Sequence, residues 1–130
     1  MRFLLITSIF ISSLSFGIDS QYIYTDGNNN TYSLRGDTLN YYPVKKINSS
    51  SGQYDGGDSK SIQLDKDQIE KLIDLFNLTL NNIDIHQKKR EMGCGTLVVI
   101  ESKNEQRIYI KRNAQEKIQM EQYLKELFEN

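Results

Sequence analysis

Apolar and polar residues alternate along the first third of the chain, a pattern typical of strands that are buried on one face. Tyr22 and Tyr24 alternate with Ile23, and Tyr32 and Leu34 repeat the pattern after a turn rich in Gly and Asn. The alternation predicts an antiparallel meander of three strands, at residues 21–25, 31–35 and 38–44. Pro43 has no N–H to donate, so we expect it at a sheet edge or at the end of its strand.

Two later segments have apolar residues at helical spacing. The first follows Asp65, which with Gln68 three residues later makes a capping-box pattern, and its apolar stripe is Ile69, Leu72, Ile73, Phe76 and Leu80. The second follows Asn113, a predicted cap with Glu116 at the third helical position, and its apolar face is Ile118, Met120, Tyr123, Leu124, Leu127 and Phe128. Both faces must be buried, most simply against the sheet.

Shorter β-like segments complete the fold. They are residues 61–64, 96–100 and 106–112, of which the β-branched run 96–100 is predicted to be the central strand. The alternation of Ile83, Ile85 and Gln87 also suits a short strand, which is not counted in the order below. The sequence therefore predicts an α+β fold with one mostly antiparallel sheet. Its order is four strands, a helix, two strands and a second helix, with both helices packed on one face.

The first seventeen residues have the three parts of a secretory signal peptide. Arg2 is followed by an apolar run from Phe3 to Phe16, and Ser15 and Gly17 suit the positions before a cut after Gly17. A retained anchor or a buried first helix is the alternative. The run is shorter than the ~20 apolar residues of a membrane span and contains several Ser and Thr residues. We therefore predict a signal peptide at 1–17, a single domain at 18–130, no stable membrane insertion after cleavage, and a periplasmic or secreted product.

The charge of the chain argues against nucleic-acid binding. The formal net charge is −1, and removing Arg2 with the leader leaves 15 basic and 17 acidic residues. Binding to nucleic acid requires a basic stripe that displaces counterions. The only local basic run is Lys88, Lys89 and Arg90, for which a solvated turn is the simpler interpretation than a polyanion or membrane surface.

The segment 45–60 has few residues that would enter a core and is predicted to be a long Ser/Gly-rich loop. Long loops in compact domains are often functional, although a passive solvated loop is the alternative. Small residues let a partner approach the backbone, and tyrosine is a favoured contact residue. The residues expected to bind a partner are Ser50, Ser51, Gly52, Tyr54, Asp55 and Gly56.

Within this loop, Ser51-Gly52-Gln53-Tyr54 followed by Gly56 resembles the Ser-Gly-x-x-Tyr loop of periplasmic lysozyme inhibitors of the membrane-bound and periplasmic C-type class. The likeness covers fewer than ten residues, and its spacing differs by one. In that family the loop enters the cleft of the enzyme, so the resemblance implies an inhibitor that docks a loop. Members of that family are β-barrels with a disulfide, whereas this chain has two predicted helices and a single cysteine.

No catalytic or metal-binding constellation is predicted. Cys94 and His86 are the only thiol–imidazole pair, and nothing in their spacing enforces contact, so a buried structural cysteine is favoured over an intermolecular disulfide or a nucleophile. Asp26, Asn28, Asn30 and Asp37 partly follow the spacing of a calcium loop. The sixth position lacks Gly and the flanks are strands, which favours a plain hairpin turn.

Asp55 and Asp58 are the other candidate for chemistry, as a pair of carboxylates for general acid–base work. Such a pair needs two different environments, and an exposed loop gives both side chains the same one. We therefore expect a non-enzymatic protein without a cofactor: an exported inhibitor or immunity-type protein that binds a protein partner. The alternative is a carrier of small ligands or a structural protein of the envelope, using a sheet face rich in Tyr22, Tyr24, Tyr32, Tyr41 and Tyr42.

Overall fold

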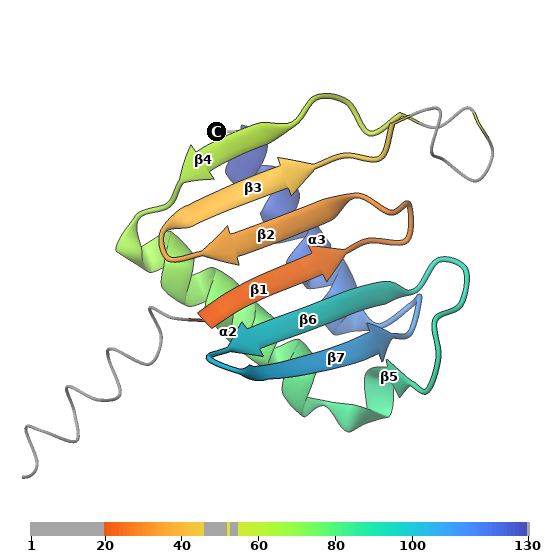
Figure 1. The fold of residues 1–130 in the computed structure, drawn as a ribbon. Coiled ribbons are helices and arrows are strands. Elements are labelled where there is room, and N and C mark those ends of the chain that lie inside the picture. Colours follow the sequence, from red (N-terminus) through yellow and green to blue (C-terminus); the bar gives the residue numbers. More distant parts are fainter. Residues whose placement is uncertain (1–19, 46–51, 53–54, 130) are drawn as a thin grey trace, which may run out of the picture.

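The computed structural model describes residues 20–45, 52 and 55–129, so the predicted leader and part of the long loop lie outside the described residues. These residues form one antiparallel sheet of seven strands, and both helices cover the same face of it (Figure 1). The predicted α+β class and its single sheet are confirmed. The elements in chain order are β1 (Ser20–Thr25), β2 (Thr31–Arg35), β3 (Thr38–Tyr42), β4 (Lys60–Gln63), α2 (Lys66–Asn81), the 3₁₀ turn η2 (Ile83–Ile85), β5 (His86–Gln87), β6 (Gly95–Glu101), β7 (Asn104–Ile110) and α3 (Gln115–Glu129).

The sheet has the order β4-β3-β2-β1-β6-β7-β5, with every neighbouring pair antiparallel. The central strand is therefore β1 rather than the predicted 96–100 segment, which forms β6 beside it. Strand β1 pairs with β2 on one side and with β6 on the other, and Ile23 lies opposite Ser33 and Val98. A β-branched run indicates a buried strand, but it does not distinguish the middle position in a sheet from the next one.

The core lies between the sheet and the helices. Tyr22 and Tyr24 of β1 are buried there, as the alternation predicted. Tyr22 stacks on Phe76 of α2, with ring centroids 5.0 Å apart and nearly parallel planes. The rest of the core comes mainly from leucine and isoleucine side chains on the other strands and on both helices.

Helix α2 begins as predicted. The Asp65 carboxylate accepts a hydrogen bond from the Gln68 N–H at 2.9 Å, and the Gln68 side chain accepts one from the Asp65 N–H at 3.0 Å. This reciprocal capping box satisfies two amides that the helix itself leaves without partners. Leu72 and Phe76 are fully buried on the apolar stripe that follows.

Helix α3 begins differently from the prediction. Its first helical residue is Gln115, so Ala114 rather than Asn113 precedes it, and the Ala114 carbonyl accepts from the Ile118 N–H at 3.1 Å. Alanine has no side-chain acceptor for a cap, and Asn113 lies one residue too early. On the apolar face, Met120, Leu124 and Leu127 are buried as expected, but Ile118 is 45% exposed.

The segment after α2 also differs from the prediction. The alternation at 83–87 suited a short strand, but Ile83–Ile85 forms a 3₁₀ turn and only His86–Gln87 pairs with β7. The Asn82 side chain accepts from the Asp84 N–H at 3.2 Å, and this local hydrogen bond favours the turn over an extended backbone. No helix formed by the described residues has the length and hydrophobicity of a bilayer span.

Candidate functional site

The predicted partner-binding residues fall into two groups. Ser50, Ser51 and Tyr54 lie outside the described residues. Gly52 and Asp55 are exposed, whereas Gly56 is half-buried against the domain. The described part of the loop therefore consists mainly of its base, which lies beside the turn between β1 and β2.

The base of the loop is fixed to the domain by hydrogen bonds. The Gly56 N–H donates to the Val44 carbonyl at 2.9 Å, and the Tyr41 hydroxyl donates to the Gly56 carbonyl at 2.8 Å. The Val44 N–H donates to Asn30 Oδ1 at 3.0 Å, so the first side of the loop is also held. The two ends of the loop are thus joined to each other and to the sheet.

Only glycine fits at position 56. A Cβ placed there would lie 2.2 Å from Asn30 Oδ1 and 2.8 Å from Pro43 Cβ. Asn30 is buried and Pro43 is rigid, so neither neighbour would move without disturbing the turn or the strand end. Gly56 therefore positions the loop.

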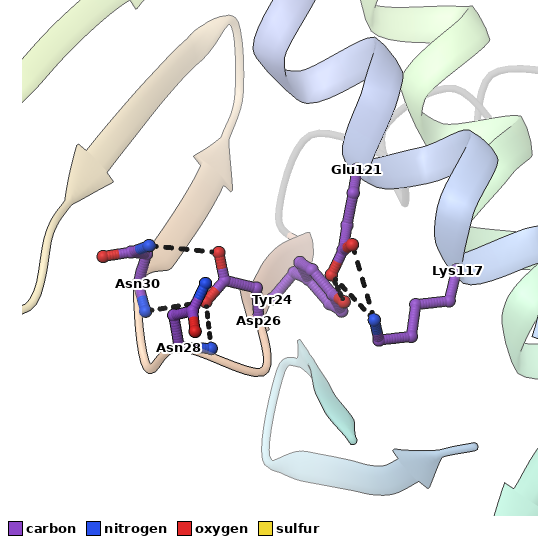
Figure 2. A network of polar contacts seen from close by, with 6 residues as sticks. All are labelled: Tyr24, Asp26, Asn28, Asn30, Lys117 and Glu121. Carbon is purple, nitrogen blue, oxygen red and sulfur yellow. Dashed lines mark hydrogen bonds and ion pairs between the residues drawn. The ribbon is translucent and has the colours of Figure 1, made fainter. Parts of the chain in front are cut away.

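The turn between β1 and β2 is built around Asp26 (Figure 2). Its Oδ1 accepts from the backbone N–H groups of Asn28 and Asn30, each at 2.9 Å, and its Oδ2 accepts from Asn30 Nδ2 at 3.2 Å. The carboxylate thus closes the predicted hairpin turn between β1 and β2. Asp37 lies beyond the other end of β2, about 17 Å along the strand, and is too far to share a cation with Asp26. Among the described residues, no group of three or more His, Cys, Asp or Glu side chains is arranged to hold a metal ion.

A second polar network lies under this turn, between β1 and α3 (Figure 2). The buried Tyr24 hydroxyl donates to Glu121 Oε2 at 2.5 Å. Lys117 Nζ lies 3.2 Å from the same oxygen and 3.4 Å from Oε1. The Lys117 side chain is only 8% exposed and that of Glu121 is 23% exposed. Burial and the adjacent Glu121 carboxylate raise the pKa of Tyr24 well above its usual value.

Two pockets open beside these networks. The first, of about 240 Å³, is lined by residues from the turn, the loop base and the end of α3. Its aromatic side is formed by Tyr32, Tyr41 and Phe128, whose ring centroids lie 4.9 to 6.1 Å apart. The second pocket, of about 340 Å³, adjoins the first, because Asp26, Asn28, Tyr32 and Lys125 line both. We call this end of the molecule the rim: the turn 26–30, the loop base at 43–45 and 55–57, and the side of α3 that lines the two pockets.

Cys94 and His86 are not brought together. His86 and Gly95 lie opposite the same residue, Ile110, but on the two sides of β7, so their backbones are about 10 Å apart. His86 Nε2 lies 2.8 Å from the Thr79 carbonyl oxygen. Cys94 is 3% exposed, and its sulfur accepts from the Glu91 N–H at 3.3 Å. The expectation of a buried cysteine is confirmed.

The other charged candidates are all on the surface. Asp55 and Asp58 are both exposed, and Asp55 accepts from the Gly57 N–H at 2.8 Å, as in a simple turn. Lys88, Lys89 and Arg90 are exposed as well, and the Arg90 side chain donates to Asn29 Oδ1. Arg90 therefore adds a contact to the turn at the rim.

Sequence reasoning missed the network of Lys117 and Glu121. The signal was present, because Lys117, Met120, Leu124 and Leu127 follow helical spacing and all four are buried. A lysine at the first position of such a stripe, with glutamate four residues later, indicates a charged pair that faces the core.

Comparison with family models, with curated proteins and with solved structures found no match to this chain.

Proposed function

We propose that this chain is an exported, non-enzymatic binding protein, an inhibitor or immunity-type protein that contacts a protein partner through the loop 45–60. In this proposal Ser50, Ser51, Gly52, Tyr54 and Asp55 contact the partner, and Gly56 joins the loop to the domain. The observation that carries the proposal is the fixed base of the loop. The support for export is the signal-peptide pattern of residues 1–17.

A fixed base favours binding because it lowers the entropy lost when a loop is ordered by a partner. The three hydrogen bonds at Gly56 and Val44 hold the two ends of the loop in one place. The residues between them are small or polar, apart from Ile47 and Tyr54. The arrangement suits a loop in which Tyr54 supplies the aromatic contact area.

The likeness to the lysozyme-inhibitor loop supports the inhibitor form of this proposal. It is confined to the loop, because the described domain has a sheet covered by two helices rather than a barrel. We therefore propose for this chain only the mode of action of that family, in which a small-residue loop with one tyrosine enters an enzyme cleft.

The alternative of a ligand carrier depended on the tyrosines of the sheet. Tyr22, Tyr24 and Tyr32 are buried under the helices and pack in the core, and Tyr41 packs against it. Tyr42 is 52% exposed but lies on the sheet face opposite the two helices. No specific observation favours the carrier, which stays an untested alternative.

The proposal is tested by capturing partners from an envelope extract of the source organism, with the purified protein as bait. We expect a specific protein to be captured by the wild type and by Tyr42→Ala, and to be lost with Tyr54→Ala. Tyr42 is a matched control, because it is an exposed tyrosine on a strand of the same sheet. Equal capture by Tyr54→Ala would remove the loop from the proposal, and no specific capture by the wild type would contradict it.

The inhibitor form has a direct assay. Purified protein is added to a C-type lysozyme, and cell-wall lysis is followed by turbidity. The resemblance predicts inhibition by the wild type and by Tyr42→Ala, and more than tenfold weaker inhibition by Tyr54→Ala, as for a central aromatic contact residue. No inhibition by the wild type would exclude this enzyme class while leaving the capture experiment to decide on other partners.

A further inference from the structure

The second pocket of the rim is lined by an excess of positive charge. Its positively charged side chains are Arg112, Lys117 and Lys125, and its negatively charged side chains are Asp26 and Glu121. Gly27 and Gly93 form part of its wall, where a Cβ on Gly93 would lie 2.9 Å from the Arg112 side chain. The glycine backbone therefore leaves Arg112 room to lie along the wall.

Both carboxylates of this pocket are already engaged. Asp26 accepts three hydrogen bonds from the turn that it closes. Glu121 accepts from the Tyr24 hydroxyl and pairs with Lys117. Within the described residues, no ion pair involves Arg112 or Lys125. The guanidinium group of Arg112 and the ammonium group of Lys125 are thus available to a ligand.

Lys117 supplies the decisive observation. Its ammonium group has three N–H donors, and the acceptors that it meets are the two oxygens of Glu121. At least one donor is left over on a side chain that is more than nine-tenths buried and lines the pocket. Burying a charged donor is costly unless its hydrogen bonds are made, so an acceptor that enters the pocket is favoured.

We infer that this pocket binds an oxyanion, either a phosphate or a carboxylate group. Arg112 and Lys125 neutralise its charge from the open side, and the spare donor of Lys117 bonds it from the floor. Charge-assisted hydrogen bonds of this kind are shorter and stronger than neutral ones. The inference stands on the pocket alone and does not require the loop to bind a partner.

Titration of the ¹⁵N-labelled protein with inorganic phosphate tests it, at constant ionic strength so that screening does not change. We expect saturable shifts of the amide resonances of Gly27, Gly93 and Lys117. Arg112→Gln and Lys125→Gln should each weaken binding about five- to tenfold, the usual effect of losing one charge-assisted contact. Both side chains are exposed, so neither variant threatens the fold.

Lys103→Gln is the matched control. Lys103 is exposed in the turn between β6 and β7, at the opposite end of the sheet from the rim. It should bind phosphate within twofold of the wild type. The inference is overturned if neither phosphate nor acetate gives a saturable shift, or if the control weakens binding as much as the two pocket variants do.

A parallel titration with acetate distinguishes the two sources of an oxyanion. Saturable binding of acetate with the same dependence on Arg112 and Lys125 assigns the pocket to carboxylates, including acidic side chains. Saturable binding of phosphate alone assigns it to phosphate groups. Failure of this inference would leave the capture experiment with Tyr54→Ala unaffected, because the oxyanion pocket and the partner-binding loop use different residues.

Discussion

Helices α2 and α3 cover the same face of the sheet, yet different interactions hold them there. Helix α2 starts with a complete capping box and buries Leu72 and Phe76 on an apolar stripe. Helix α3 starts after an alanine and buries a lysine among its apolar residues. Where the two helices meet, Lys71 Nζ lies 4.4 Å from the ring centroid of Tyr123.

The difference shows where the fold carries unusual polar chemistry. The position of α2 follows from local capping and apolar burial, which need no other explanation. Helix α3 instead carries a largely buried ion pair that Tyr24 links to β1, and such pairs contribute less to stability than apolar packing of the same volume. The rim, which holds this pair, two pockets and the loop base, is therefore the end of the molecule where a function is best sought.

The largest expected effect comes from breaking the ion pair on α3. Glu121→Gln leaves the buried Lys117 ammonium without its counter-charge and should lower the free energy of unfolding by about 3 kcal/mol. Urea denaturation measures the loss. Glu126→Gln, at an exposed position on the same helix, should change stability by less than about 0.5 kcal/mol.

A second substitution sharpens this test. Adding Lys117→Met to Glu121→Gln removes the buried charge that lacks a counter-charge and should restore most of the lost stability, because the neutral Gln side chain can still accept from the Tyr24 hydroxyl. If Glu121→Gln alone were as stable as the wild type, the Lys117–Glu121 pair would contribute no more than a surface contact. The contrast between an apolar α2 and an α3 with a largely buried ion pair would then be wrong.

Tyr24→Phe should have the next largest effect, and its size should depend on pH. Loss of the hydrogen bond to Glu121 should cost about 1–2 kcal/mol at neutral pH. The pKa of Tyr24 is raised above 10.0 in the folded state, chiefly by burial and also by Glu121 and Asp26. Above pH 10 the unfolded chain therefore releases a proton that the folded chain keeps, and stability falls as pH rises.

Denaturation at pH 8 to 11 measures this dependence. The wild type should lose stability more steeply above about pH 10 than Tyr24→Phe does, so that the two curves approach each other. Part of the slope should persist in the variant, since the pKa of Tyr22 is also raised by burial. Parallel curves would contradict a buried Tyr24 hydroxyl.

The smallest expected effects compare the two helix starts. Asp65→Ala removes the cap of α2 and should cost about 1 kcal/mol. Asn113→Ala should cost less than about 0.5 kcal/mol, because Asn113 does not occupy the capping position of α3. Equal losses in thermal denaturation would show that Asn113 does cap α3.

Most of the fold was predictable because its signals are local. The alternation of Tyr22, Ile23 and Tyr24 and the Asp65–Gln68 cap each appear within a few residues of sequence. Misassignments arose where two local signals competed. Asn113 and Ala114 differ by one position at the helix start, and residues 83–85 alternate like a strand although the Asn82 side chain stabilises a turn.

The site was predictable only in part, because it joins distant segments. The sequence indicated the loop at 45–60, but it gave no sign that Asn30 would bond to Val44 or leave no room beside Gly56. The approach of Tyr24 to Glu121 spans 97 residues and follows from tertiary packing. The buried position of Lys117 did have a local signal in its helical spacing, and counting it as a core position would have revealed the pair.

We propose that the protein binds its partner through the loop 45–60, whose base lies at the rim. The most direct measurement maps a captured partner onto the ¹⁵N-labelled protein by amide shift perturbation. We predict that the perturbed residues cluster at 43–60 and at the turn 26–30, and that the turn at Ser102 and Lys103 is unaffected. Perturbations centred on that opposite turn, or on the sheet face opposite the two helices around Ile23 and Val98, would contradict the proposal.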